Sequence, residues 1–440
     1  MTTEIDRGRF LSLDLEKYEI GEFLGKGAYG IVIKAVDKLH RKDVAIKHIS
    51  KIAQSAHGTS KIIRELFLLN SLQHSNILSL IDVSMVEKDL YVVTDFYEFD
   101  LHKITYANVK GTKSKASIIR KRSDYLYVLY QILDAVQYIH SIGVLHRDIK
   151  PANILVSLNL HIKLCDFGFA RLVDNSGVYL ADDEKLTEYV VTRWYRAPEV
   201  FLNPGRYGKA QDIWAVACSF CELFRRYPLF PGQNTVDQVQ LVVNMMGTIK
   251  EDDFNFEMTP RGRRFLSRLK PSGEGLRATI GTAGEIHPKL LLLLLEMLQF
   301  NPNKRITAEN AMKQKIFNRC RKEVVDEEIE EVCWDDYHAY LSSVSPNMSY
   351  FQLIQCVQKL TDDIALDIQS RDIGSHFEKI VADLDGEDND DTKSISSRVS
   401  NTSKTSRKSA FSVINAVPDG LNQDGFPIIS HEENMTHSLS

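Results

Sequence analysis

A short glycine-rich segment between two apolar stretches places the tightest limit on how this chain can fold. Gly25-Lys26-Gly27-Ala28-Tyr29-Gly30 is followed at once by Ile31 and Val32. Glycines let backbone N–H groups come close to phosphate oxygens, because no Cβ atom stands in the way. A dinucleotide-binding turn has the same glycine spacing, but it opens a helix, whereas the β-branched residues here predict a strand. The segment therefore predicts a strand, a turn and a second strand that can cover a phosphate group.

The rest of the chain divides into a strand-rich part and a helical part. Stretches rich in Val, Ile, Leu and aromatic residues predict strands at 18–24, 31–36, 43–49 and 90–95. One helix, at 60–72, interrupts them. From about residue 124 to 318, apolar residues at helical spacing predict helices that include 125–140, 211–224 and 288–298. We therefore expect an α+β fold, with a small β-rich lobe over 18–98 and a larger helical lobe over 99–317.

Composition limits the class of protein to which the chain can belong. Its 440 residues are 43% hydrophobic and 26% charged, as in ordinary soluble proteins, and a net charge of −5 gives no reason to expect nucleic-acid binding. No secretory signal is visible, and the apolar run Leu290–Leu295 is far shorter than the roughly twenty residues of a membrane span. Six dispersed cysteines form no disulfide framework. We expect Cys218 and Cys221 on one face of a buried helix.

Four segments stand outside the predicted core of the two lobes. Residues 1–17 precede the first strand, and residues 103–123 form an insert, of which we expect 110–122 on the surface because that part is basic and poor in apolar residues. Residues 318–380 extend the chain beyond the helical lobe. Residues 381–440 are acidic and then rich in Ser and Thr. They bury too little apolar surface to offset chain entropy, so we expect them to be disordered.

The clearest chemical pattern is His146-Arg147-Asp148-Ile149-Lys150-Pro151-Ala152-Asn153, which Asp166-Phe167-Gly168 follows thirteen residues later. Transfer of a phosphoryl group needs an aligned hydroxyl, metal ions on the phosphates and cations for the spread charge. Asp148 can accept or orient the hydroxyl proton, and Lys150 can stabilise the transferred group. Asn153 and the aspartate of the second motif offer the hard oxygen ligands that Mg²⁺ prefers. We interpret these residues as a site for phosphoryl transfer.

A lysine and a glutamate complete this set of residues. Lys47 ends Val44-Ala45-Ile46-Lys47, on the strand after the glycine segment, where it can contact nucleotide phosphates. Glu65 lies on the predicted helix 60–72 and can pair with Lys47. Most lysines and glutamates are solvated surface residues. The apolar strand residues beside Lys47, and its place after the glycine segment, argue against that interpretation here.

A segment between two motifs contains a pair of hydroxyl residues. Asp166-Phe167-Gly168 and Ala197-Pro198-Glu199 bracket a stretch, here called the lip, that includes Thr187-Glu188-Tyr189. Each phosphate added to such a residue brings about −1.5 to −2 charges and three strong acceptor oxygens. A tripeptide alone recurs by chance, so its position between the two motifs gives it meaning. It predicts an enzyme that is inactive until Thr187 and Tyr189 are phosphorylated.

Together these motifs resemble those of eukaryotic protein kinases. Thr187-Glu188-Tyr189 with residues 192–199 resembles the mitogen-activated protein (MAP) kinases of the CMGC group, in the extracellular-signal-regulated type. The resemblance covers about residues 18–320 and implies a bilobal protein kinase fold. It implies transfer of the γ-phosphoryl of ATP, with Mg²⁺, to Ser or Thr before Pro in protein substrates. It also implies an upstream MAP kinase kinase and phosphatases as partners.

The resemblance assigns nucleotide contacts to a set of residues on the strands and loops around the site. Thr94 corresponds to the gatekeeper residue, and the backbone of 95–97 to the hinge that meets adenine. The full set is Gly25, Lys26, Gly27, Ala28, Tyr29, Gly30, Val32, Ala45, Lys47, Thr94, Asp95, Tyr97, Asn153, Leu155 and Asp166. The metal ligands among them are Asn153 and Asp166, and the catalytic residues are Asp148, Lys150, Lys47 and Glu65.

The resemblance also implies how the lip phosphates would be bound. The phosphate of Thr187 would be held by three arginines: Arg64, Arg147 and Arg171. The phosphate of Tyr189 would meet Arg193 and Arg196, beside a pocket for the substrate proline. Arginine suits phosphate because its planar guanidinium donates two parallel hydrogen bonds. Without phosphate the three like charges repel, which favours an open, inactive arrangement.

Three further positions are implied to support the lip and the catalytic loop. Glu199 and Arg305 resemble a buried ion pair that anchors the lip, and Asp212 resembles the helix carboxylate that steadies the catalytic loop. A helix at 350–360 resembles the C-terminal extension of the family, so we expect residues 318–380 to pack on the core. Phe169 departs from the family pattern, because it replaces the usual Leu after the metal motif.

Docking of partner proteins is a further expectation with two interpretations. The family binds basic and apolar partner segments through acidic residues that follow the last core helix. Here Lys322 stands where those residues begin, and the acidic residues come later, as Asp326, Glu327 and Glu328. Docking through these residues and a solvated acidic helix face explain the pattern equally well.

Two alternative functions remain to be compared with the MAP kinase interpretation. A cyclin-dependent-kinase-like or autophosphorylating CMGC kinase would share most motifs, although the helix 60–72 lacks the cyclin-contact motif. A scaffold that binds without chemistry predicts losses among the catalytic residues, and Lys47, Asp148, Asn153 and Asp166 are all present. We expect a location in the cytoplasm, with the nucleus as an alternative, and no membrane span.

Overall fold

The computed structural model contains two units, Met1–Thr361 and Asp362–Ser440. It describes residues 17–26, 30–50, 52–107, 118–119, 121–173, 178–180, 192–247, 251–269, 275–281, 286–322 and 332–385. The second unit is described only for the last part of helix α13 (Tyr350–Asp385). Among the described helices, none has the length and apolar character needed to cross a membrane.

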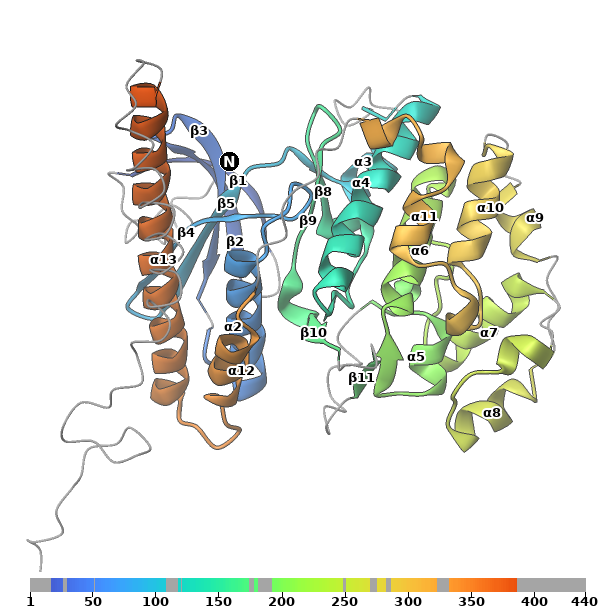
Figure 1. The fold of residues 1–440 in the computed structure, drawn as a ribbon. Helices are drawn as coiled ribbons and strands as arrows, with labels where there is room; N and C mark the ends of the chain where they lie inside the picture. The colour runs from blue at the N-terminus through green and yellow to red at the C-terminus, as the bar shows by residue number, and fades with distance from the viewer. Residues whose placement is uncertain are drawn as a thin grey trace, which may run out of the picture. The chain divides into compact units, whose positions relative to one another are not determined.

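A five-stranded antiparallel sheet forms the small lobe (Figure 1). Its strands, in the order β1-β2-β3-β5-β4, are β1 (Tyr18–Lys26), β2 (Gly30–Asp37), β3 (Lys42–Ile49), β4 (Leu80–Val86) and β5 (Asp89–Asp95). Every second residue of β2 is buried, because alternate side chains of a strand face opposite sides of a sheet. Ile31, Ile33 and Ala35 pack with Val44 and Ile46 of β3 in one apolar cluster. The four predicted strands are confirmed.

Strand β4 is missing from the prediction. Its sequence alternates between apolar and polar residues from Ile81 to Met85, with Asp82 and Ser84 as the polar members, a strand signal that the sequence analysis missed. Pairing with β5 along most of its length stabilises it, and a tight turn at Glu87, with φ of 56°, joins the two strands. The strand is therefore supported both by its own pattern and by its neighbour in the sheet.

Helix α2 (Ala56–Ser71) is the predicted helix of the small lobe. Ile62, Ile63, Leu66 and Leu69 are buried, as their spacing predicts. The helix begins at Ala56, before the predicted residue 60. Ser55 caps it, since its side chain accepts a hydrogen bond of 3.1 Å from the N–H of Gly58.

The large lobe is helical, as predicted. Its helices are α3 (Leu101–Tyr106), α4 (Arg122–Ser141), α5 (Pro198–Leu202), α6 (Ala210–Arg225), α7 (Thr235–Met246), α8 (Pro260–Leu266), α9 (Leu276–Gly281), α10 (Pro288–Met297) and α11 (Ala308–Met312). α6 buries Cys218 and Cys221, which are free thiols on the expected helix face.

The predicted insert 103–123 is helical at both ends, because α3 reaches Tyr106 and α4 begins at Arg122. A bond of 2.8 Å from the N–H of Lys121 to Asp124 fixes that beginning.

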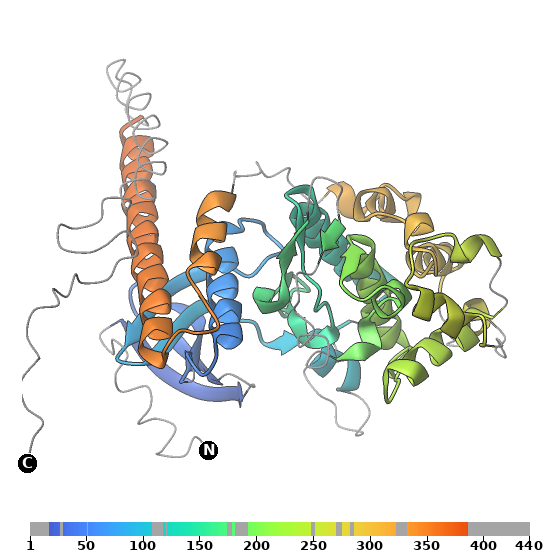
Figure 2. The same ribbon diagram turned by 90° about the horizontal axis from the view of Figure 1, so that it is seen from below.

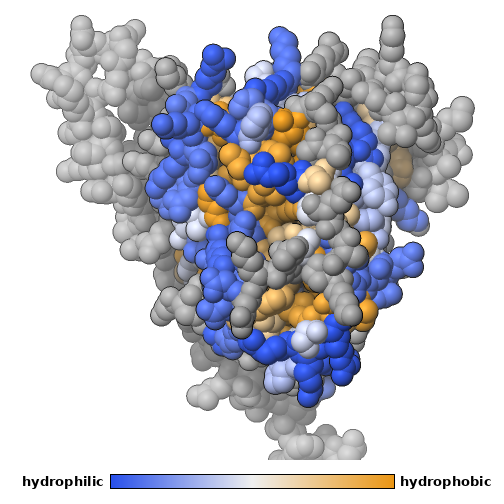
Figure 3. All heavy atoms as spheres, turned by 90° about the vertical axis from the view of Figure 1, so that its right-hand side faces the viewer, coloured by the Kyte–Doolittle hydropathy of each residue, from blue (hydrophilic) through white to orange (hydrophobic). Residues whose placement is uncertain are grey.

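Helix α10 contains the leucine run and is only partly buried. Leu290, Leu293 and Leu294 are buried, but Leu292 is 48% exposed. Six consecutive leucines cannot all face the core, because helical residues point around the axis at 3.6 per turn. The leucine run therefore lies on a helix that buries one face and exposes the other. Figure 3 shows this end of the large lobe, where apolar surface lies between polar margins.

Short strand pairs set the position of the predicted catalytic residues. β6 (Phe99–Asp100), β8 (Ile154–Val156) and β9 (Ile162–Leu164) form one small sheet, in which β8 is central. β7 (Val144–Leu145) pairs with β10 (Arg171–Leu172) in another. Residues 146–153 therefore run between β7 and β8, and Asp166 lies between β9 and β10. The two sequence motifs are brought together by this topology.

The extension after the large lobe returns to the small lobe. Helix α12 (Trp334–Ser342) packs on α2, and Figure 2 shows the two side by side. The ring centroids of Phe67 and Tyr337 are 5.5 Å apart at this contact. The first residues of α13 bury Leu353, Val357 and Leu360. The predicted helix 350–360 is thus confirmed but longer, since α13 continues to Asp385.

Candidate active site

The predicted lysine–glutamate pair is formed. Lys47 extends from β3, and its Nζ lies 2.7 Å from Oε1 of Glu65 on α2. Burial alone would lower the pKa of Lys47, but the charges of Glu65 and Asp166 outweigh it and raise the pKa above its usual range. Lys47 therefore stays cationic, and the pair links the sheet to the helix.

Asp148 lies between β7 and the short 3₁₀ helix η1 (Pro151–Asn153). Its Oδ2 accepts a bond of 2.7 Å from Nζ of Lys150 and one of 3.0 Å from Nδ2 of Asn153. Both donors use the same oxygen, which leaves Oδ1 for a substrate hydroxyl. Burial raises the pKa of Asp148, with Lys150 opposing part of that shift. A raised pKa makes the carboxylate a stronger base, as proton acceptance requires.

A buried carboxylate on α6 holds the catalytic loop. Asp212 accepts the backbone N–H groups of His146 and Arg147, each at 2.9 Å, and it also lies 2.9 Å from Nε2 of His140. Burial would raise the pKa of Asp212, but its contact with His140 outweighs burial and the pKa is lowered. Arg147 adopts a φ of 68°, which is unfavourable for a residue with a side chain. The two backbone bonds to Asp212 hold this conformation, in the role that the resemblance implies.

Asp166 adopts a left-handed backbone conformation, with φ of 66°. Phe167 beside it is fully buried, and its ring centroid lies 4.9 Å from that of His146. Burial would raise the pKa of Asp166, but the charges of Lys47, Lys61 and Lys150 lower it, so the carboxylate is ionised. The backbone oxygen of Asn153 accepts the N–H of Cys165 at 3.0 Å, which ties the two predicted metal ligands together.

The glycine segment spans the ends of β1 and β2. Gly25 and Lys26 end β1 and Gly30 begins β2, whereas Gly27, Ala28 and Tyr29 lie outside the described residues. A Cβ atom at Gly30 would lie 1.8 Å from the carbonyl oxygen of His48. Gly30 is therefore required by the close approach of β3, a reason that the sequence analysis did not give. A Cβ at Gly25 would meet nothing within 4 Å.

The other predicted nucleotide contacts lie on strands around the site and at the hinge. The strand residues, on β2, β3, β5 and β8, are Val32, Ala45, Thr94 and Leu155. At the hinge, Oδ1 of Asp95 accepts a bond of 2.6 Å from Lys42, and the hydroxyl of Tyr97 lies 3.3 Å from Nδ1 of His161. Burial raises the pKa of Tyr97. Both side chains contact protein, so a ligand would meet the hinge through its backbone.

The three arginines predicted to bind phosphate donate to three successive carbonyl groups. Nη1 of Arg64 donates to Gly168 at 3.0 Å, that of Arg147 to Phe169 at 3.3 Å, and that of Arg171 to Ala170 at 2.9 Å. The three guanidinium groups thus contact one short backbone segment, whose carbonyl oxygens offset the repulsion among them. The expected open arrangement concerns the lip, most of which lies outside the described residues. Thr187 and Tyr189 lie outside the described residues.

The end of the lip is anchored on the large lobe. Nη1 of Arg193 donates to the carbonyl of Gln233 at 3.0 Å, and Arg196 is half-buried at the end of the short helix η4 (Arg193–Tyr195). Arg305 and Glu199 form a bidentate pair, with N–O distances of 2.6 and 3.0 Å. Upstream, β11 (Val178–Leu180) pairs with β12 (Arg206–Gly208). The segment is thus tied to the large lobe at both ends.

Two residues at the site were missed by sequence reasoning. The hydroxyl of Tyr337, on α12, accepts a bond of 3.3 Å from Nε of Arg64. Lys61 lies on α2, with its Nζ 3.6 Å from the ring centroid of Phe169. No sequence signal marks Tyr337. Lys61 had one, since it lies four residues before Glu65 and therefore on the same face of the helix.

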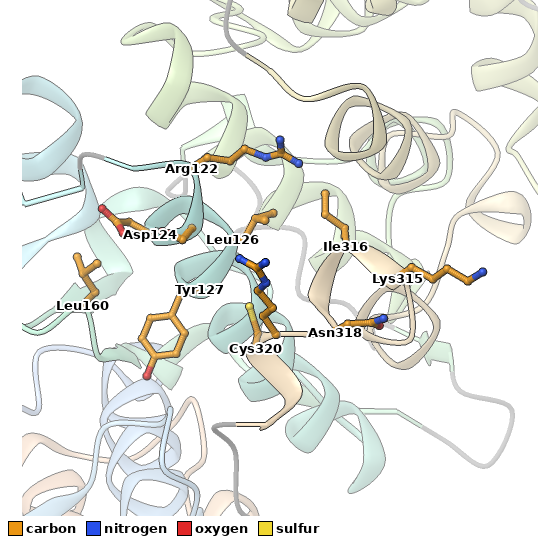
Figure 4. Close-up of a pocket in the computed structure, with 11 residues that line it drawn as sticks. Arg122, Asp124, Leu126, Tyr127, Leu160, Lys315, Ile316, Asn318 and Cys320 are labelled. Atoms are coloured by element: carbon orange, nitrogen blue, oxygen red, sulfur yellow. Dashed lines mark hydrogen bonds between the residues drawn. The ribbon is translucent and has the colours of Figure 1, made fainter.

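A separate pocket of about 690 Å³ lies on the large lobe. Figure 4 shows its lining, which comes from the start of α4 on one side and from the 3₁₀ helix η7 (Lys315–Phe317) on the other. Leu126, Leu160 and Ile316 supply apolar surface, and the cationic side chains on its lining are Arg122, Lys315 and Arg319. Asp326, Glu327 and Glu328 follow this region in the chain but lie outside the described residues.

Comparison with known proteins agrees with this geometry. The family model described as "Protein kinase domain" matches residues 18–317. Mitogen-activated protein kinase 4 of Oryza sativa subsp. japonica is 39% identical over 294 residues, which cover 66% of this chain and 75% of the relative. Extracellular signal-regulated kinase 2 of Dictyostelium discoideum is 38% identical over 301 residues, which cover 68% and 78%. The chain therefore belongs to the mitogen-activated protein kinases, a family of serine/threonine protein kinases.

Proposed function

We propose that this kinase transfers the γ-phosphoryl group of ATP, with Mg²⁺, to Ser or Thr before Pro, and that phosphorylation of Thr187 and Tyr189 activates it. The observation that carries the proposal is the environment of Asp148. Lys150 and Asn153 donate hydrogen bonds to one oxygen of its carboxylate. The ionised Asp166 lies between β9 and β10. In this arrangement Asp148 can meet the substrate hydroxyl, Asn153 and Asp166 the metal, and Lys150 the phosphoryl group.

The chemistry of the side chains fits a nucleotide with its metal. Asn153 uses its amide nitrogen on Asp148, which leaves the amide oxygen for a cation, and Asp166 supplies a charged oxygen. No cluster of three His, Cys, Asp or Glu side chains that could hold a metal occurs in the described part of the chain. Retention of Mg²⁺ would thus depend on these two residues and on phosphate oxygens. ATP and Mg²⁺, when bound, would supply the phosphoryl group and neutralise its charge.

Each catalytic residue then has a defined task. Oδ1 of Asp148 orients the substrate hydroxyl and accepts its proton, while Oδ2 stays bonded to Lys150 and Asn153. Lys150 places a positive charge beside the transferred group. Lys47 orients the phosphates, because Glu65 holds its ammonium group at 2.7 Å. Movement of α2 would break this last contact.

In the proposed activation, the three arginines exchange their carbonyl partners for the phosphate of Thr187. Their guanidinium groups contact neutral carbonyl oxygens at residues 168, 169 and 170. A phosphate on Thr187 offers charged oxygens, which form stronger bonds with arginine. Since Arg64 lies on α2 and Arg147 beside Asp148, one phosphate would connect the helix, the catalytic loop and the lip. An upstream MAP kinase kinase would add this group, and a phosphatase would remove it.

Phosphorylation of both lip residues should raise phosphorylation of a Ser-Pro peptide by at least about a hundredfold, since several positioning contacts form together. A peptide with Ala in place of Pro should be phosphorylated poorly. Arg171→Ala should remove most of the gain while nucleotide affinity stays unchanged. The assay measures transfer from labelled ATP to each peptide, with Asp148→Asn as the inert control.

Other outcomes of that assay would favour the alternatives. Phosphate acquired on Tyr189 by purified, unphosphorylated protein would indicate an autophosphorylating kinase. An inert phosphorylated enzyme that still binds partners would indicate a scaffold. Equal loss of activation and of nucleotide binding in Arg171→Ala would contradict the proposed phosphate contact.

We also propose that partner proteins dock at the pocket between α4 and η7 through apolar and basic residues. Apolar side chains would contact Leu126, Leu160 and Ile316. Basic side chains would meet the acidic run Asp326-Glu327-Glu328, which begins six residues after the lining residue Cys320. The cationic lining of the pocket would repel them, so the acidic run must supply the attraction.

Charge reversal separates these contributions to docking. Replacing the three acidic residues with Lys should weaken binding of a labelled basic–apolar peptide by about tenfold or more, measured by fluorescence anisotropy. Arg319→Ala should strengthen it. Tighter binding of a peptide with acidic residues in place of the basic ones would show that the partner carries the opposite charge.

A further inference from the structure

Lys61 is a buried cation that the proposed mechanism does not use. It lies on α2, one helical turn before Glu65, and is 6% exposed. Its Nζ lies 3.6 Å from the ring centroid of Phe169, which is 8% exposed. A cation over an aromatic face is attracted by the negative electrostatic potential that the ring quadrupole creates there, most strongly where water is excluded. Lys61 and Phe169 therefore form a shielded cation–π pair between α2 and the predicted metal motif.

The stem of Lys61 covers the residues before Phe169. A Cβ atom at Gly168 would lie 2.5 Å from Cε and 2.9 Å from Cγ of Lys61, so the lysine stem packs directly on the glycine. The positive charge of Lys61 also helps to keep Asp166 ionised. One side chain thus acts on Asp166, Gly168 and Phe169.

The backbone of this segment needs such support. Asp166 has a φ of 66°, a region that residues with side chains rarely adopt and that surrounding contacts must maintain. Phe167 packs into the large lobe against His146. From the other side, α2 supplies the bond from Arg64 to Gly168 and the contact between Lys61 and Phe169. Asp166 is therefore held between the two lobes.

We propose that Lys61 is a positioning residue, which with Phe169 fixes Asp166 and couples the metal motif to α2. The proposal rests on the proposed role of Asp166 as a Mg²⁺ ligand. Because α2 carries both Lys61 and Glu65, the helix position in which Glu65 pairs with Lys47 is also the one in which Lys61 covers Phe169. The Phe at position 169, which departs from the family pattern, gains a function in this way, since Leu offers no aromatic face.

A double-mutant cycle tests the pair. Lys61→Met keeps the unbranched stem but removes the charge, and Phe169→Leu removes the ring. Each should speed amide hydrogen exchange at residues 168–170 by about tenfold in protein free of metal and nucleotide, the size of one shielded cation–π contact. The double variant should exchange no faster than either single one, because the contact is lost once. Lys88→Met, which removes a cation 5.6 Å from the ring of Tyr350, is the matched control and should exchange as wild type.

Kinetics supply a second readout. Lys61→Met should lower kcat about tenfold in both the unphosphorylated and the lip-phosphorylated enzyme. The Mg²⁺ concentration for half-maximal activity should not rise, because a positive charge beside Asp166 has been removed. If Lys61 acted through packing alone, its loss would lower kcat and would also raise the Mg²⁺ concentration for half-maximal activity.

Three results would overturn the proposal. The first is an amide hydrogen-exchange rate at residues 168–170 that is the same in Lys61→Met as in the wild type. The second is a double variant whose increase in exchange rate equals the product of the two single increases. An effect on kcat confined to the lip-phosphorylated enzyme would show that Lys61 binds the phosphate and does not position Asp166. Hydrogen exchange is measured without Mg²⁺, so it still reports on positioning even if Asp166 proves to bind no metal.

Discussion

Replacing Asp148 with Asn should lower kcat by about 10²- to 10⁴-fold, the usual contribution of a positioned general base. Asn is close to Asp in shape, so the loop should keep its conformation while losing the proton acceptor. Nucleotide affinity should change little, because Asp148 is not among the residues assigned to the nucleotide or the metal, and Asn can still accept the bonds from Lys150 and Asn153. Transfer of labelled phosphate to a Ser-Pro peptide measures kcat, and a fluorescent nucleotide analogue measures affinity.

A surface carboxylate provides the control for this substitution. Asp43, half-exposed on β3 and paired with Lys34 at 2.6 Å, should tolerate Asn with activity within about twofold of wild type. The pH profile gives a further check on the base. Burial raises the pKa of Asp148, so activity should fall on acidification at a higher pH than an ordinary aspartate would give. Retention of full activity in Asp148→Asn would exclude the assigned role.

Replacing Arg305 with Met should lower the free energy of unfolding by about 3–5 kcal/mol, because Glu199 is left charged and buried without a partner. The side chains of Arg305 and Glu199 are 0% and 6% exposed. Arg305 also donates to the carbonyls of Gln299 and Ala210 at 2.9 and 2.7 Å, and both bonds would be lost. Thermal unfolding followed by circular dichroism should show a fall in Tm of roughly 10 °C.

Two comparisons make this result specific to the buried pair. Adding Glu199→Gln to the variant should recover part of the lost stability, since it removes the unpaired charge. Arg206→Met, which breaks an exposed pair with Glu257 at 2.8 Å, should cost under about 1 kcal/mol. Equal losses from the buried and the exposed pair would contradict the account of Glu199 and Arg305.

The parts of the site that could be predicted are those whose pattern is local in sequence. Strand β2 shows its alternation within eight residues, and residues 146–153 carry three functional side chains on one loop. The link between Lys47 and Glu65 was predicted from the resemblance to protein kinases, on a strand and a helix that each had a clear pattern of their own. The choice of partner for Arg64 was not. Tyr337 lies 273 positions away, and only the return of the chain to the small lobe brings the two together.

Other features depend on neighbours that a pattern does not reveal. Gly30 needs its missing Cβ because the carbonyl of His48 approaches across the sheet, so its role depends on register. Lys61 carried only one sequence signal, its place on the same helix face as Glu65, and its contact with Phe169 became apparent only in the structure. In each case tertiary contact determines the role, and local composition gives at most a hint.

The bonds from Arg64, Arg147 and Arg171 to three adjacent carbonyls have a consequence for how fast and how often the enzyme can be switched. Because the three cations are already close together, the site would lose little conformational freedom when a phosphate binds. The phosphate would replace the carbonyl groups as the partner of the arginines, and the cluster would not have to assemble first. In the proposed switch, removal of the phosphate would return the guanidinium groups to the same backbone oxygens. Repeated, reversible cycles would then require no rebuilding of the cluster in either direction.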